Sequence, residues 1–205
     1  MIHTGSYKIT SLLTVLFFVA TIQLNAQQKA AESNIKVHGN WTITVKNQDG
    51  EVVKQRNFEN SLEQKGAGAL VEMMASEYAF GRWNVSIDAG TEDNDLCQNS
   101  DGQRDTCYLT EKDLFQDPNR FETLTLQTPE SGDNTNALVL TGNFTADYDG
   151  NVGRVATFFA YCDNDTAPQG CDSGAGEAIF TSKSIQGISV SANQQVTVTV
   201  VISFS

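Results

Sequence analysis

Residues 196–204 read VTVTVVISF, and this stretch decides the fold class. Its apolar side chains recur at every second position, and hydroxyl side chains fill most of the positions between them. Such alternation predicts a β-strand with one buried face and one face toward water. The same pattern occurs over residues 35–45, where Val37, Trp41 and Ile43 fall on one face. We therefore expect two long, one-sided strands near the two ends of a β domain.

Shorter segments of similar character lie between these two. They are expected as strands over residues 51–58, 83–87, 121–126, 137–144, 152–161 and 177–181. Turn-forming residues separate them, as in the NQDG sequence at 47–50. Short strands joined by hairpin turns predict a mainly β chain, an antiparallel β-sandwich of eight or nine strands rather than a closed barrel. We expect one domain over residues 35–205.

One segment has helical spacing instead. Apolar residues recur on one face over residues 62–77, which predicts a single short helix. Ser61 and Gln64 fit the S-x-x-Q pattern of a capping box at its start. Because glycine weakens a helix, we expect Gly66 and Gly68 to lie where the helix touches the sheet.

The start of the chain has the pattern of an export signal. Lys8 precedes an uncharged apolar run over residues 9–22, which is shorter than the roughly 20 residues needed to span a bilayer. We predict a signal peptide over residues 1–26, a flexible lead-in over 27–34, and no transmembrane segment after cleavage. The LNAQQ sequence at 24–28 is typical of bacteria. The protein is thus expected to be secreted, on the cell surface, extracellular or periplasmic.

The net charge of the chain limits the classes of molecule that it can bind. The formal net charge is −12 at pH 7, so the chain repels nucleic acids and anionic lipid headgroups, and we expect no nucleic-acid partner. An acidic surface favours solubility, cation binding or a partner with a basic face.

The cysteines form two close pairs, Cys97 with Cys107 and Cys162 with Cys171. Three pairings are possible for four cysteines. Local pairing is favoured because each pair brackets a polar, turn-rich segment, and closing a loop of about ten residues stabilises the fold by ~2–3 kcal/mol. Neither pair has the spacing of a redox or zinc motif, so the cysteines are expected to be structural.

Acidic loops are the best candidate site in this sequence. Residues 88–117 contain nine carboxylates against two cations. Calcium takes about six to eight oxygen ligands and would relieve the repulsion among them. The candidate calcium ligands, from this loop and from residues 147–151, are Asp93, Asp95, Asp101, Asp105, Asp147 and Asp149. No segment matches the EF-hand pattern, so solvated loops stay open as the alternative, and DYDGN at 147–151 also suits a hairpin turn.

Catalytic signals are weak. After removal of the signal, His38 is the sole histidine, within an alternating strand, where an exposed polar position is expected. The chain has no nucleophile-elbow or zinc-protease motif, so we expect no enzyme and no cofactor apart from calcium. Aromatic residues such as Trp41 and Trp83 could stack on a sugar, but their alternation with polar residues favours core packing.

Several short motifs resemble those of a known family. They are NFENSL at 57–62 followed by Lys65-Gly66, WNVSI at 83–87, FTS at 180–182, and the final Val/Thr strand. In this combination the chain resembles small phage tail and virion-appendage β proteins. The resemblance implies a sandwich-like structural subunit, here in an exported form with cysteine-bracketed loops that the family lacks.

Two functions follow as expectations. The first is a non-enzymatic structural or adhesive surface protein, such as a filament or matrix subunit, that self-assembles through sheet edges with residues 35–45 or 196–204 as the exchanging strand. Pairing of these two strands with each other inside one sandwich is the alternative. The second function is a secreted ligand-binding module that takes calcium or a glycan on the acidic loops.

Overall fold

The computed structural model describes residues 36–110, 121–166, 171 and 176–205. The predicted signal peptide, the lead-in and the first residue of the expected domain lie outside the described residues. Among the residues that are described, no helix is long and apolar enough to cross a membrane.

The two alternating segments form the centre of the fold as a strand pair. Strand β1 (Val37–Lys46) runs antiparallel to β11 (Gln195–Phe204) over ten paired positions. Trp41, opposite Val200, and Ile43, opposite Val198, are at most 1% exposed. Threonines pair on the other face, including Thr42 with Thr199. One face of this pair therefore belongs to the core, as the alternation predicts.

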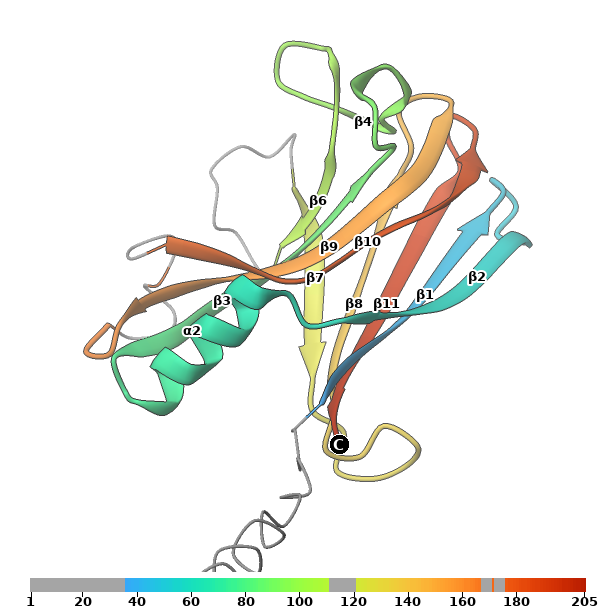
Figure 1. Ribbon diagram of the computed structural model, residues 1–205. Coiled ribbons are helices and arrows are strands. Elements are labelled where there is room, and N and C mark those ends of the chain that lie inside the picture. Colours follow the sequence, from blue (N-terminus) through green and yellow to red (C-terminus); the bar gives the residue numbers. More distant parts are fainter. Residues whose placement is uncertain (1–35, 111–120, 167–170, 172–175) are drawn as a thin grey trace, which may run out of the picture. The chain divides into compact units, whose positions relative to one another are not determined.

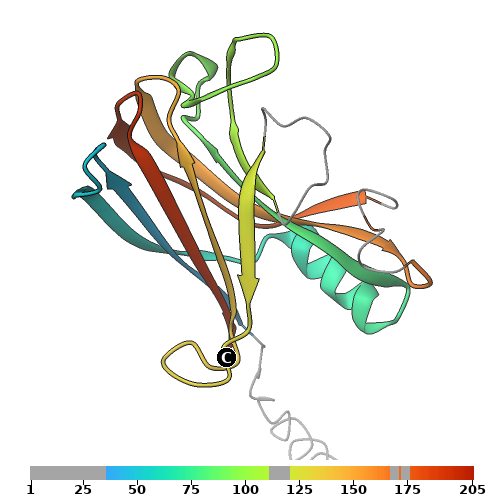
Figure 2. The ribbon, with the colours of Figure 1, turned by 180° about the vertical axis from the view of Figure 1, so that it is seen from behind.

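Nine strands form one continuous sheet in the described part of the chain, in the order β10-β9-β3-β6-β7-β8-β11-β1-β2. The remaining strands of this sheet are β2 (Val52–Ser61), β3 (Tyr78–Asp88), β6 (Cys107–Thr110), β7 (Phe121–Gln127), β8 (Leu138–Thr145), β9 (Gly150–Asp163) and β10 (Gly176–Val190). Neighbours are antiparallel except β6 and β7, which are parallel. The strands on either side of this parallel pair form the two layers of a sandwich (Figures 1 and 2). The predicted fold class is confirmed.

The two strands expected to exchange are interior strands. Strand β1 lies between β11 and β2, and β11 lies between β8 and β1. They pair with each other, which is the alternative given above, and the edges of the main sheet are β2 and β10. Any assembly through sheet edges therefore has to use β2 or β10.

The helix is shorter than expected and begins differently. Helix α2 spans Gln64–Met74, its N-cap is Glu63, and that residue makes no side-chain capping bond. The predicted capping box is wrong because Ser61 is the last residue of β2. The backbone N–H of Glu63 instead donates to the Phe180 oxygen at 2.8 Å, so pairing with β10 determines where the helix starts.

The sequence predicts that Gly66 and Gly68 both contact the sheet, and only one of these two contacts is present. A Cβ on Gly66 would lie 2.8 Å from the Phe180 Cα, so this glycine does allow the helix to approach β10. Gly68 has no neighbour within 4 Å of the same position, so its prediction is wrong.

Aromatic residues fill the core beside the helix. Trp83 lies 5.3 Å from Phe159 and 5.2 Å from Phe180 between ring centroids. Trp41 and Trp83 are 1% and 7% exposed, which confirms core packing for both. His38 is half-buried rather than exposed, and its Nε2 lies 3.1 Å from the Ser205 hydroxyl.

Both disulfides join local pairs, as expected. Cys97 bonds to Cys107 with the Cα atoms 5.2 Å apart, and Cys162 bonds to Cys171 with the Cα atoms 5.7 Å apart. The first one closes a loop that contains the two-stranded hairpin of β4 (Cys97–Gln98) and β5 (Arg104–Asp105).

The two helix glycines provide a matched test of this packing. We expect Gly66→Ala to lower the free energy of unfolding by about 1–3 kcal/mol, because the new methyl group meets the β10 backbone. Gly68→Ala should raise it by about 0.5–1 kcal/mol, because the position is open and alanine favours a helix. Urea unfolding followed by circular dichroism measures both. Equal effects of the two substitutions would contradict the contact.

Candidate functional site

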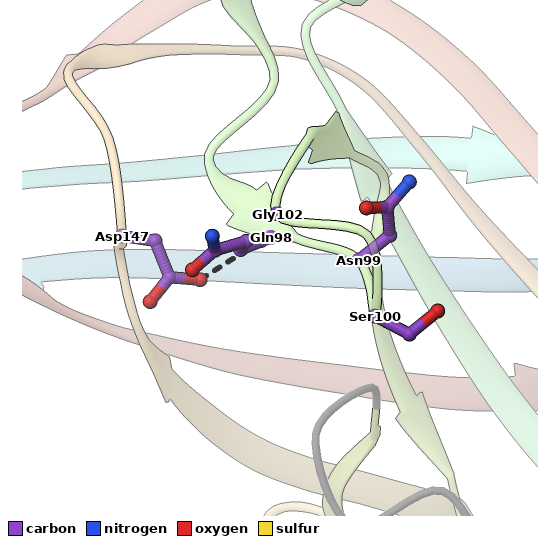
Figure 3. A pocket seen from close by; sticks show the side chains of 5 residues that line it. All are labelled: Gln98, Asn99, Ser100, Gly102 and Asp147. Atoms are coloured by element: carbon purple, nitrogen blue, oxygen red, sulfur yellow. Dashed lines mark hydrogen bonds between the residues drawn. The ribbon is translucent and has the colours of Figure 1, made fainter.

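A polar pocket is lined by residues of the loops at one end of the sandwich. The hairpin that contains β4 is labelled at this end in Figure 1. We call this pocket the loop pocket, and it is lined by Gln98, Asn99, Ser100, Gly102 and Asp147. Its volume is about 350 Å³. The β4–β5 hairpin supplies four of these residues and the β8–β9 connection supplies Asp147, so two distant segments meet here (Figure 3).

A tight turn forms the hairpin side of the loop pocket. The Asn99 Oδ1 accepts hydrogen bonds from the backbone N–H groups of Asp101 at 3.0 Å and Gln103 at 2.9 Å. Gly102 has a φ of 76°, a left-handed conformation that glycine adopts without a steric penalty. The NSDG sequence at 99–102 therefore supplies both the side-chain acceptor and the glycine that the turn requires.

The hairpin is bonded to the β8–β9 connection along both of its strands. The Gln98 N–H donates to the Asp147 Oδ2 at 2.8 Å, as Figure 3 shows. The Asp147 N–H donates in turn to the Leu96 oxygen at 2.8 Å. The Tyr148 hydroxyl donates to the Gly102 oxygen at 2.9 Å. These bonds hold the two walls of the pocket together, because each one joins the hairpin segment to the β8–β9 connection.

Arg104 joins three segments behind the loop pocket. Its Nη1 donates to the backbone oxygens of Asp95 and Asp149, both at 2.8 Å. Its guanidinium carbon lies 4.6 Å from the centre of the Tyr148 ring, within the range of a cation–π contact. A half-buried cation thus lies among the acidic residues. In the sequence, Arg104 is one of the two cations that oppose the nine carboxylates of residues 88–117, and no pattern marks Tyr148.

Two of the predicted calcium ligands, Asp95 and Asp149, contact this arginine through their backbone oxygens, and a third, Asp147, lines the loop pocket. Each also accepts a backbone hydrogen bond: Asp95 from Ala89 at 2.7 Å, Asp147 from Gln98, and Asp149 from Ala192 at 2.8 Å. These carboxylates therefore stabilise the loops by satisfying backbone N–H groups.

The other three predicted ligands lie nearby in sequence but outside the pocket lining. Asp93 is exposed in the 3-10 helix Glu92–Asn94, Asp101 is exposed in the hairpin turn, and Asp105 accepts a bond from the Thr106 N–H at 2.8 Å. Within the described ranges, no group of three or more His, Cys, Asp or Glu side chains could hold a metal ion. Calcium binding stays a prediction from the sequence alone.

The disulfide beneath the hairpin yields a prediction about the rigidity of the loop pocket. Replacing Cys97 and Cys107 by serine should make the Gln98 amide exchange with solvent at least about tenfold faster, since a loop of about ten residues loses its closure. Hydrogen exchange measured by NMR reports this amide directly. The matched control replaces Cys162 and Cys171 by serine, and equal acceleration in the control would contradict a local role.

The lining of the loop pocket consists of hydrogen-bonding groups with little net charge. Gln98 and Asn99 carry amides, Ser100 carries a hydroxyl, and Asp147 is the one carboxylate among the lining residues. Outside the loop pocket, partial burial raises the pKa of Glu177, at the start of β10. Comparisons with protein-family models, curated proteins and solved structures found no match to this chain.

Proposed function

We propose that this protein is a non-enzymatic adhesive or structural protein of the cell exterior, and that its loop pocket binds a neutral glycan. The observation that carries the proposal is the lining of the loop pocket, which combines amide, hydroxyl and carboxylate groups on a disulfide-closed hairpin. Sugar hydroxyls donate and accept hydrogen bonds, and amide side chains do the same. A rigid set of such groups suits a polyol better than an apolar ligand.

A neutral glycan is favoured over calcium by the number of carboxylates. Calcium requires about six to eight oxygen ligands and usually several carboxylates. The loop pocket offers the single carboxylate of Asp147, which already accepts the Gln98 N–H. Such a carboxylate can accept a further bond from a sugar hydroxyl, because each carboxylate has about four lone-pair sites.

An exterior location and a non-catalytic role are supported by the cysteines and by the pocket lining. Two disulfides persist in an oxidising compartment, in agreement with the signal peptide that the sequence predicts. The lining residues of the loop pocket include no histidine, cysteine or lysine that would activate Ser100 or serve as a base. Binding is the chemistry that these groups support.

Glycan binding is tested with an immobilised library of neutral glycans and the oxidised chain purified after export. We expect one class of neutral glycan to be retained, equally with calcium and with EDTA. Substituting both Gln98→Ala and Ser100→Ala should weaken retention about tenfold, since two neutral hydrogen bonds are lost while the backbone bond to Asp147 stays.

The matched control substitutes Gln127→Ala and Ser131→Ala, which are also exposed polar residues but lie outside the loop pocket. The control should bind like the unmodified protein. Retention of no glycan, or equal retention by the Gln98/Ser100 variant, would overturn the proposal. Retention abolished by EDTA would restore the calcium version of the site.

A further inference from the structure

The two edges of the main sheet, β2 and β10, face each other along a line that we call the seam, formed by residues 52–63 and 180–190. At one end of the seam the edges are joined through the backbone. Leu62 and Thr181 form an antiparallel bridge, and the Glu63 N–H donates to the Phe180 oxygen at 2.8 Å. The sheet is therefore closed at this end, next to the start of α2 (Figure 1).

Farther along the seam, the two edge strands are connected by cationic side chains rather than by backbone–backbone hydrogen bonds. Lys54 Nζ donates to the Ser189 oxygen at 2.6 Å, and Arg56 Nη1 donates to the Gln186 oxygen at 2.5 Å. Lys183 on β10 reaches in the opposite direction and donates to the Glu59 oxygen. Main-chain oxygens of both edges are thus satisfied by side-chain cations rather than by the N–H groups of a neighbouring strand.

The two β2 cations extend from the core-facing side of their strand. Lys54 is paired with Val45 and Arg56 with Ile43, and both of these β1 residues are fully buried. Directly opposed residues of antiparallel strands share a face of the sheet. Inward-pointing charges on an edge strand oppose uncontrolled pairing with other chains. In this protein, Lys54 and Arg56 also donate to β10 oxygens that would otherwise accept N–H groups from an added strand.

A groove lies between the edges where these cations cross. It has a volume of about 360 Å³ and is lined by Lys54, Gln55, Arg56, Gly187, Ile188 and Ser189. The lining includes two cations and no carboxylate, on a chain whose formal net charge is −12. The local charge favours an anionic occupant, and walls made of edge strands favour an extended backbone.

We propose that the seam is an acceptor groove for an extended acidic peptide segment of a partner protein. The segment would add as a strand along β10, and its N–H groups would replace Lys54 and Arg56 on the Ser189 and Gln186 oxygens. The two released cations then bind acidic side chains of the segment, because a carboxylate is a stronger acceptor than a backbone carbonyl. This site shares no residue with the loop pocket, so it stands or falls independently of glycan binding.

The test uses a fluorescent eight-residue peptide of alternating threonine and aspartate, with binding followed by fluorescence anisotropy. We expect saturable binding to the oxidised protein. Substituting both Lys54→Gln and Arg56→Gln should weaken it about tenfold. The matched control, Lys36→Gln with Lys65→Gln, removes the same charge from exposed positions outside the groove and should bind like the unmodified protein.

A second peptide separates strand addition from simple charge attraction. It carries proline in place of each threonine, so it keeps the aspartates but lacks half of the N–H donors. We expect it to bind at least about tenfold more weakly, since an added strand is held by main-chain hydrogen bonds. Circular dichroism and thermal unfolding establish that each variant is folded, and Lys54→Gln alone serves as the milder variant.

Three results would overturn the proposal. The first is the absence of binding by the threonine–aspartate peptide, and the second is equal binding by the proline peptide. The third is a molecular mass that rises with protein concentration in the absence of peptide and stays monomeric in the Lys54/Arg56 variant. That last result would make a second copy of this chain the occupant of the seam.

Discussion

The pairing of β1 with β11 is the constraint on which the rest of the structure depends. It joins segments from the two ends of the described chain in ten uninterrupted pairs, and the Lys36 and Ser205 backbones add two further hydrogen bonds beyond it. Because a shift of one residue would turn the buried Val196, Val198 and Val200 of β11 toward solvent, this register is strongly specified. Strands β8 and β2 then pair on its two sides. Leu140 and Phe144 of β8 extend the same core layer, and the partly buried Phe58 of β2 packs against it.

The nine-stranded sheet that contains this pair forms two layers, so that its two edge strands, β2 and β10, lie next to each other. The edges are joined by backbone bonds near Leu62 and Thr181, and farther along β10 its register with β9 is irregular between Ser184 and Ile188. Long cationic side chains bridge the remainder. Such a closure protects the edge strands from non-specific pairing, yet it is made of contacts that a competing strand can displace individually.

The loops at the β4–β5 end of the sandwich are held together by hydrogen bonds of charged side chains rather than by strand pairing. Their carboxylates are numerous, but several of them accept backbone N–H bonds, and Arg104 draws the surrounding carbonyl oxygens together. Repulsion among like charges is thereby reduced within the chain itself. The pocket that results is lined mainly by amide and hydroxyl groups, and the proposal of a neutral glycan in place of calcium rests on this lining.

Features that depend on residues close together in the sequence could be predicted, whereas features that depend on residues far apart in the sequence could not. Alternation located the strands with one buried face, and local turn chemistry located the hairpins, because both depend on neighbouring residues. The start of α2 at Glu63 and the central position of Arg104 depend on partners more than 40 residues away. The long polar part of β10 depends on its pairing with β9. Gly66 and Gly68 illustrate the limit: two equal residues on one helix differ only in whether β10 lies against them. Both sites proposed for this chain lie where distant segments meet, so local sequence patterns identify their residues one at a time but not the sites that they form together.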